Sequence, residues 1–273
     1  MTTVLCGSIS LHPASLGSTM HRAAYRALGL DYNYVPFKVT DVAGALTGMR
    51  ALGIRGFGVS MPHKLTVIPL LDRLAPLAKR IGAVNTIVND DGVLTGHNTD
   101  ALGARGALEE HTELAGKRVV LVGAGGAARA VAFSLLEAGA HVTLVNRSPE
   151  RAQELAATLT KELGDDSAVG CGSLDAPPAD VDILVNTSSG GMANIELDPR
   201  VNAFVEAPAI VMDIVYKPTQ TALVALARAR GKVAIHGGRM LLHQAQAQFE
   251  LYTGRRPALE IMDRALREAL GEA

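Results

Sequence analysis

The sequence predicts an α/β protein with room for one large domain or two modest ones. Short apolar stretches of strand length alternate with stretches of helical periodicity along most of the 273 residues. A glycine-rich turn at residues 123–126 joins an apolar strand to a helix, as in a doubly wound parallel sheet. The pattern becomes purely helical after residue 236. The pattern therefore divides the chain into an α/β segment in residues 1–101, a doubly wound segment in residues 102–236, and C-terminal helices in residues 237–273.

Helix and turn signals mark the elements of the first domain. Gly29 is a C-terminal helix stop, Asp41 is an N-cap, and residues 89–92 form a polar turn between two apolar stretches. The predicted strands are residues 4–8, 34–39, 56–59, 84–88 and 93–95, and the predicted helices are residues 19–28, 41–52 and 98–110.

The second domain begins with a strand-turn-helix-strand pattern. Residues 118–122 and 141–145 are apolar strands, and residues 127–138 between them form a helix. Pro149 suits the first turn of the next helix, which reaches residue 163. Further strands are predicted at residues 183–185, 210–213 and 233–235, and the last helices at residues 240–252 and 257–270.

Composition excludes several classes of protein. The chain is 48% hydrophobic and 19% charged with a net charge of -1, which is typical of a globular protein and gives no reason to expect nucleic acid or a membrane as partner. It has no leader-like N-terminus and no membrane-length apolar run, so we expect a cytoplasmic protein.

Cys6 and Cys171 lie far apart and are expected to be buried free thiols. The histidines have no ligand spacing, so no metal is predicted.

The glycine-rich turn has the pattern of a dinucleotide site. Gly123 permits a tight turn out of the strand, and Gly125 lets the backbone approach a pyrophosphate. Ala128 allows close packing of the helix, whose N-terminus offers free N–H groups to phosphates. Such a fingerprint alone is weak, but the required strand and helix flank it here. The predicted cofactor-binding residues of this turn are Gly123, Ala124, Gly125, Gly126 and Ala127.

The end of the next strand favours NADP(H) over NAD(H). An acidic residue that would bind a ribose 2′-hydroxyl is absent, and the chain has Asn146, Arg147 and Ser148 there, with Arg151 one turn later. Guanidinium groups suit a 2′-phosphate. The alternative is that the arginines are ordinary surface residues. For Arg151 this alternative stands equally with phosphate binding, whereas the position of Arg147 at the end of the strand favours phosphate binding. Additional use of NAD stays open.

Polar segments at strand ends and turns of the first domain are the candidates for chemistry. They are Ser15, residues 58–64, residues 82–86 and residues 96–100. A lysine and an aspartate from these segments, Lys64 and Asp100, could share proton transfer at a hydroxyl or ketone. From spacing alone, the two could equally form a structural salt bridge.

Six motifs, in order, resemble the shikimate dehydrogenase family over nearly the whole chain. They are Ser60-x-Pro62-x-Lys64, Gly82-Ala-Val-Asn85-Thr86, Asn98-Thr99-Asp100, Gly123-Ala-Gly-Gly-Ala, Asn146-Arg147 and Met240-Leu-Leu-His-Gln244-Ala245. The resemblance implies a substrate domain in residues 1–101, a Rossmann NADP-binding domain in residues 102–236, and C-terminal helices that return to the first domain.

The resemblance also implies a role for each matching residue. Lys64 and Asp100 correspond to the catalytic pair, whereas His63, His12 and His97 are not expected to be catalytic. The implied substrate-binding residues are Ser15, Ser60, Asn85, Tyr216 and Gln244. The implied cofactor-binding residues add Asn146, Arg147, Arg151 and Gly238 to the glycine-rich turn, and no metal is implied.

The chain departs from the family pattern at substrate-holding positions. The second serine of the usual Ser-x-Ser-Pro segment is Gly17 here, with Ser18 or Thr19 as a possible substitute, and the asparagine of the usual Asn-Val-Thr segment is Gly58. The usual Asn-Ala-Thr-Pro-x-Gly-Met loop is Asn-Thr-Ser-Ser-Gly-Gly-Met at residues 186–192 here. Because a charge-assisted hydrogen bond is worth about 1.5–3 kcal/mol, these changes loosen substrate identity while the catalytic pair is kept. The chain resembles most closely the shikimate dehydrogenase-like branch.

The implied activity is reversible, NADP-dependent reduction of 3-dehydroshikimate to shikimate, within aromatic amino acid biosynthesis. The expected partner is a small cyclic hydroxy acid, and the expected assembly is a monomer or homodimer. One alternative is the same chemistry on quinate or another cyclic hydroxy acid, which Gly17 and Gly58 favour. A second alternative is a catalytically silent NADP-binding sensor, which the intact Lys64 and Asp100 argue against.

Overall fold

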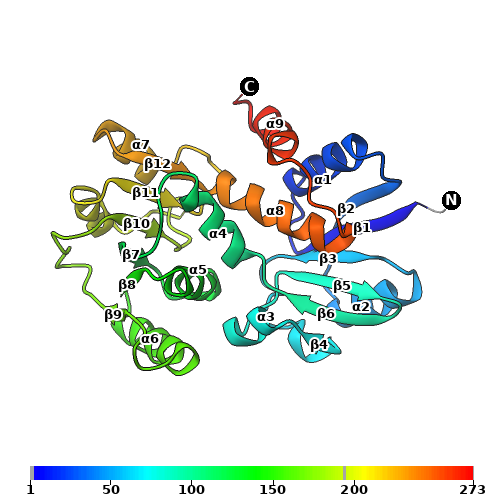
Figure 1. Ribbon diagram of the computed structural model, residues 1–273, viewed down its shortest axis with the longest axis horizontal. Helices are drawn as coiled ribbons and strands as arrows, with labels where there is room; N and C mark the ends of the chain where they lie inside the picture. Colours follow the sequence, from blue (N-terminus) through cyan, green and yellow to red (C-terminus); the bar gives the residue numbers. More distant parts are fainter. Residues whose placement is uncertain (1–2, 193–194, 273) are drawn as a thin grey trace. The chain divides into compact units, whose positions relative to one another are not determined.

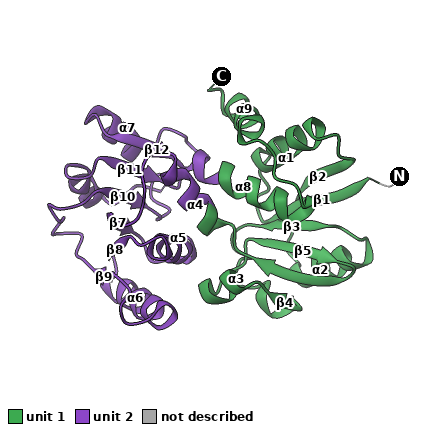
Figure 2. Ribbon diagram, in the orientation of Figure 1, with its two compact units in different colours: residues 1–102, 242–273 green, residues 103–241 purple. Residues whose placement is uncertain are grey.

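The computed structural model describes residues 3–192 and 195–272. Met1, Thr2 and Ala273, at the ends of the predicted segments 1–101 and 237–273, lie outside the described residues. The chain divides into a first unit, residues 1–102 with 242–273, and a second unit, residues 103–241 (Figure 2).

The first unit is built on a mixed six-stranded sheet with the order β2-β1-β3-β5-β6-β4 (Figure 1). Its strands are β1 (Val4–Ser10), β2 (Tyr32–Lys38), β3 (Gly56–Val59), β4 (Arg73–Leu74), β5 (Thr86–Asp90) and β6 (Val93–His97). β1 is parallel to β2 and β3, whereas β5 is antiparallel to both β3 and β6. The end of β3, the start of β5 and the end of β6 therefore meet at one edge of the sheet.

Helices cover both faces of this sheet. Its helices are α1 (Leu16–Ala27), α2 (Val42–Ala51), α3 (Pro76–Ile81), the start of α4 (Asp100–Glu109), most of α8 (Gly237–Thr253) and α9 (Leu259–Leu270). On one face, Leu46 and Met49 of α2 pack with Phe57 in a buried apolar cluster. On the other, α1 meets α8 through Tyr25 and Phe249, whose ring centroids are 4.9 Å apart. The apolar faces of both helices account for their position.

The second unit has a six-stranded, fully parallel sheet with the order β12-β11-β10-β7-β8-β9. Its strands are β7 (Arg118–Val122), β8 (His141–Val145), β9 (Val169–Cys171), β10 (Ile183–Asn186), β11 (Ile210–Asp213) and β12 (Val233–His236). Its helices include α5 (Gly126–Glu137), α6 (Pro149–Leu163) and α7 (Ala222–Ala229). The chain reverses direction across the sheet between β7 and β10, and the carboxyl ends of strands at such a switch point are where ligands bind in open α/β sheets. The predicted α/β class is confirmed.

Several short elements were not expected from the sequence. They are α3, β4, β9, α7, and 3-10 turns at Ile68–Leu70 and Pro199–Val205. Cys6 is buried, and burial raises the pKa of its thiol to about 12. The expectation of a second buried thiol is wrong, because Cys171 is exposed on the edge strand β9.

The described residues contain neither a candidate membrane-spanning helix nor a candidate metal site. No helix among them has the length and apolarity to cross a membrane. Likewise, no group of three or more histidine, cysteine, aspartate or glutamate side chains in the described ranges is arranged to hold a metal ion.

Candidate active site

The structure brings Lys64 and Asp100 into direct contact. Lys64 Nζ donates a hydrogen bond to Asp100 Oδ2 at 2.6 Å. Lys64 lies in the segment after β3, where its carbonyl accepts a hydrogen bond from Val84 N at 3.0 Å. The Lys64 side chain is 23% exposed, whereas that of Asp100 is 4% exposed. The ammonium group can therefore reach solvent or a ligand while the carboxylate behind it is held in place.

Asn85 holds the other oxygen of the same carboxylate. Its Nδ2 donates to Asp100 Oδ1 at 2.9 Å and to Thr99 Oγ1 at 3.0 Å. Its Oδ1 accepts from Thr99 N at 2.7 Å and from Thr86 Oγ1 at 2.9 Å. Asn85 is completely buried. Both ends of its amide are thus occupied within the protein, and they fix the orientation of Asp100.

The start of α4 positions Asp100 on the sheet edge. Asn98 Oδ1 accepts hydrogen bonds from Asp100 N at 3.1 Å and Ala101 N at 3.3 Å, as an N-cap side chain does. Asn98 Nδ2 donates to Ala83 O at 3.0 Å. Asp100 therefore stands in the first helical turn, where the helix dipole favours a negative charge.

The other predicted substrate-binding residues are divided between the units. Ser15 and Ser60 are exposed, and Gln244 on α8 is half-buried, all within the first unit. Among the described residues, neither serine hydroxyl has a hydrogen-bond partner, so both are free to bind a ligand. Tyr216 follows β11 in the second unit and is half-buried.

The glycine-rich turn of the second unit has the geometry of an anion site. Gly123 has φ +117°, and a Cβ there would lie 2.7 Å from Thr187 Oγ1, so the turn requires glycine. No side chain caps the N-terminus of α5 at Gly125. Open space lies beside Gly125 and Gly126. The first N–H groups of α5 are therefore available to phosphate oxygens.

The flanking cofactor candidates line the same strand ends. Asn146 Nδ2 donates to Ser148 O at 2.9 Å and closes the turn after β8. Arg147 and Arg151 are exposed and form no hydrogen bond or ion pair within the described ranges. Arg200, with a smaller contribution from Arg147, holds the pKa of Asp198 below its usual range. The guanidinium groups are thus available to a 2′-phosphate.

The remaining cofactor candidates have small side chains. Ala124 and Ala127 are half-buried beside the glycines of the turn. Gly238 is buried at the start of α8, and its N–H donates to His236 Nδ1 at 3.2 Å.

Sequence reasoning missed part of both polar networks. In the first unit, Gln248 Nε2 donates to Thr86 Oγ1 at 2.9 Å and so joins the Asn85 network. In the second, Asn186 Nδ2 donates to Asp213 Oδ1 at 3.0 Å, and Thr221 Oγ1 donates to Asp213 Oδ2 at 2.6 Å. Thr86 lies within the motif at residues 82–86. Gln248 and Asp213 have no sequence signal beyond being polar residues in apolar segments.

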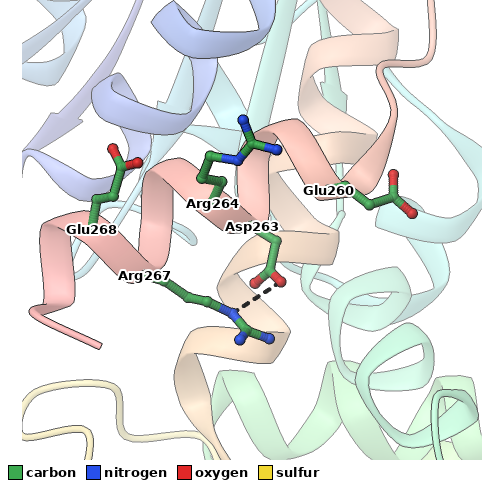
Figure 3. A pocket seen from close by; sticks show the side chains of 5 residues that line it. All are labelled: Glu260, Asp263, Arg264, Arg267 and Glu268. Carbon is green, nitrogen blue, oxygen red and sulfur yellow. Dashed lines mark ion pairs between the residues drawn. The ribbon is translucent and has the colours of Figure 1, made fainter. Parts of the chain in front are cut away.

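A charged pocket on α9 is unrelated to these sites. Figure 3 shows the side chains that line it, Glu260, Asp263, Arg264, Arg267 and Glu268. Arg267 Nε lies 3.1 Å from Asp263 Oδ2, one helical turn away. None of the predicted site residues belongs to this pocket, and pairing along one exposed helix is typical of a solvated surface.

Comparisons with known proteins cover both units. The family described as shikimate dehydrogenase substrate binding domain matches residues 11–87, shikimate / quinate 5-dehydrogenase matches residues 105–215, and shikimate 5′-dehydrogenase C-terminal domain matches residues 237–267. A shikimate dehydrogenase (NADP(+)) of Moorella thermoacetica is 46% identical over 276 residues, which cover 95% of this chain and 92% of the relative.

Solved structures agree with these matches. A shikimate dehydrogenase in complex with NADP+ is 38% identical with a TM-score of 0.90, covering 98% of this chain and 96% of that one. A 5-ketofructose reductase of Gluconobacter is 34% identical with a TM-score of 0.87, covering 98% and 99%. The resemblance seen in the sequence is confirmed: this chain belongs to the shikimate dehydrogenase family.

Proposed function

We propose that this protein is an NADP-dependent oxidoreductase that interconverts shikimate and 3-dehydroshikimate, with Lys64 and Asp100 as its catalytic pair. In the oxidative direction, shikimate and NADP+ give 3-dehydroshikimate, NADPH and a proton. The observation that carries the proposal is the 2.6 Å hydrogen bond between the partly exposed Lys64 Nζ and the buried Asp100. Relatives of this chain that are named shikimate dehydrogenase (NADP(+)) support it.

In this proposal Lys64 is the group that donates or accepts the proton. In the reductive direction its ammonium group donates a proton to the C3 oxygen of the substrate, and in the oxidative direction the amine takes that proton from the C3 hydroxyl. Asp100, which Asn85 holds in place, orients the lysine side chain in both directions of the reaction. Partial exposure of Lys64 allows exchange of the proton with solvent.

The second unit fits the cofactor. NADP(H), when bound, supplies or accepts the hydride. The uncapped N-terminus of α5 at Gly125 and Gly126 would hold its pyrophosphate. Arg147, aided by Arg151 and Asn146, would hold the 2′-phosphate. The other proposed cofactor contacts are Gly123, Ala124, Ala127 and Gly238.

Ser15, Ser60, Asn85, Tyr216 and Gln244 are proposed to bind the substrate. The free hydroxyls of Ser15 and Ser60 support that role for the two serines. Asn85 would act mainly by holding Asp100, because its amide is fully occupied within the protein. Residues 1–101 with the C-terminal helices would form the substrate domain, and residues 102–236 the NADP domain.

A panel of substrates and cofactors tests the proposal. We would follow NADPH or NADH absorbance with shikimate and with quinate, each with NADP and with NAD. Turnover that is strongest with shikimate and NADP is the expected result. Absence of turnover with shikimate under saturating NADP would refute the proposed substrate.

A second candidate keeps the chemistry and changes the substrate. Gly17 lacks a hydroxyl for a carboxylate, and the nearest side-chain atoms to a Cβ there belong to Tyr34, at 3.8 Å. A relative of similar fold is a 5-ketofructose reductase. Preference for an uncharged polyhydroxy ketone over 3-dehydroshikimate in the same assay would favour this candidate.

We propose that the protein is cytoplasmic and that it is a monomer or a homodimer. Gel filtration with light scattering on the purified protein decides between a monomer and a homodimer, and a mass corresponding to neither would contradict this part of the proposal.

A further inference from the structure

Gly58 lies beside a buried glutamine that no motif identifies. A Cβ built on Gly58 would lie 3.4 Å from Nε2 and 3.5 Å from Oε1 of Gln248, and 2.9 Å from the Tyr34 hydroxyl. Gln248 is 5% exposed and Tyr34 is 3% exposed. The space that a side chain at position 58 would enter is therefore filled by an amide group from α8 and a phenol from β2.

The amide of Gln248 begins a chain of hydrogen bonds that ends at the catalytic pair. Gln248 Nε2 donates to Thr86 Oγ1 at 2.9 Å, and Thr86 Oγ1 donates to Asn85 Oδ1 at 2.9 Å. Asn85 Nδ2 then donates to Asp100 Oδ1 at 2.9 Å, and Lys64 Nζ donates to Asp100 Oδ2 at 2.6 Å.

The chain has a defined direction. Thr86 Oγ1 accepts from Gln248 and donates to Asn85 Oδ1 at 2.9 Å, the shorter of its two further contacts, since Thr99 Oγ1 lies 3.3 Å away. Asn85 Oδ1 accepts this bond together with one from Thr99 N at 2.7 Å, so that the two donors turn Asn85 Nδ2 toward Asp100. A weaker bond from Gln248 Nε2 to Asn85 O, at 3.4 Å, reaches the same residue. In buried surroundings such a connected network is strong and orients its members.

We infer that Gln248 is a positioning residue: it supplies from α8 the amide that position 58 lacks, and through Thr86 and Asn85 it holds Asp100 beside Lys64. The inference rests on the proposed function for its effect on catalysis. It also explains Gly58, since Gln248 on α8 provides the amide group that β3 lacks at this position.

An exchange of the amide between the two positions tests the inference. Gln248→Ala should lower kcat about tenfold, the change that corresponds to roughly 1.4 kcal/mol, shift the pH profile of kcat and leave the KM for NADP unchanged. Gly58→Asn alone should also lower kcat, because the new side chain meets Gln248 and the Tyr34 hydroxyl. The double variant relieves the contact with Gln248 and restores an amide to this region, so it should be more active than either single variant.

Gln246 provides the matched control. It is 6% exposed on the same helix, but its Nε2 donates to Pro257 O at 2.9 Å, away from the catalytic pair. Gln246→Ala should lower the urea midpoint without moving the pH profile of kcat. If Gln248→Ala lowers kcat no more than Gln246→Ala does, or if the double variant is no more active than either single variant, the inference is overturned.

A second measurement works without turnover, so that it separates this inference from the proposed substrate. Urea unfolding of Gln248→Ala, Asp100→Ala and their combination forms a double-mutant cycle. The network predicts that the combined loss of stability is smaller than the sum of the single losses. Additive losses would overturn the inference even if shikimate is turned over, whereas a non-additive cycle with no turnover would reject only the substrate.

Discussion

Each unit buries an aspartate against an asparagine amide, but the two carboxylates have different third partners. In the first unit, Asp100 accepts from Asn85 Nδ2 at 2.9 Å and from the ammonium of Lys64 at 2.6 Å. The lysine side chain is 23% exposed. A charged, reachable donor on a buried carboxylate is the arrangement that proton transfer needs.

In the second unit, neutral and buried donors surround Asp213. Asn186 Nδ2 donates to Oδ1 at 3.0 Å, Thr221 Oγ1 donates to Oδ2 at 2.6 Å, and Val215 N donates to Oδ1 at 3.1 Å. Burial raises the pKa of Asp213. This cluster joins the ends of β10 and β11, so the same pair of residue types has neutral partners here and a charged partner, Lys64, in the first unit.

Removing the charged partner should have the largest effect on activity. Lys64→Ala should lower kcat by about 10³-fold, within the range for loss of a general acid or base, and leave NADP binding nearly unchanged. Steady-state kinetics and NADP titration check this. The exposed Lys79→Ala is the control and should have normal turnover. Unchanged kcat in Lys64→Ala would remove the contrast between the two clusters.

Asp213→Ala should act on stability instead. Leaving Asn186 and Thr221 without their buried acceptor should cost roughly 3 kcal/mol of unfolding free energy, while the folded fraction keeps its kcat. Urea unfolding measures the loss, and exposed Asp175→Ala, which removes one surface ion pair, should change stability by only about 0.5 kcal/mol or less. A large fall in kcat with normal stability would show that Asp213 is not a structural residue.

His21 should make the first unit sensitive to acid. Its ring is fully buried, and burial lowers its pKa to about 4. The unfolded chain, with a histidine pKa of about 6.5, therefore binds the proton more tightly, so stability is constant above that pH and falls between about pH 6.5 and 4.

Urea midpoints measured across this pH range test the expectation, which is a loss on the order of 2–3 kcal/mol. His21→Phe retains an aromatic ring at the position that stacks on Tyr34, with centroids now 4.3 Å apart. This variant should lose much less stability over the same interval. An equally steep loss in wild type and variant would contradict the role of His21.

The smallest effect concerns the cofactor. Arg147→Ala should raise the KM for NADP about tenfold, the effect of losing one charge-assisted contact, and barely change the KM for NAD. Arg151→Ala should have a weaker effect of the same kind. Equal changes for both cofactors would mean that Arg147 does not recognise the 2′-phosphate.

Local signals account for what the sequence predicted well. The helix at 149–163 and the strand at 56–59 match α6 and β3 residue for residue, because Pro149 suits the first turn of a helix and an apolar run ends at Val59. Lys64 and Asp100 were paired by their motifs, since spacing alone left a structural salt bridge equally possible. The contact itself depends on three strands that meet at one sheet edge.

The missed features depend on distant contacts. Gln248 and Thr86 are 162 residues apart in sequence, and no periodic pattern indicates that they form a hydrogen bond. Asp213 and Asn186 occupy the ends of separate strands, and no sequence pattern indicates that they are buried together and hydrogen-bonded. The strand β9 is too short, with three residues, for its alternation to be recognised.

The most direct test of the central claim is a stopped-flow measurement of NADPH formation from shikimate, with ordinary substrate and with substrate deuterated at C3. We predict rapid formation in the wild type, a primary isotope effect, and a rate about 10³-fold lower in Lys64→Ala with NADP still bound. No NADPH from shikimate in the wild type, or equal rates in the wild type and Lys64→Ala, would contradict oxidation of shikimate with Lys64 as the proton acceptor.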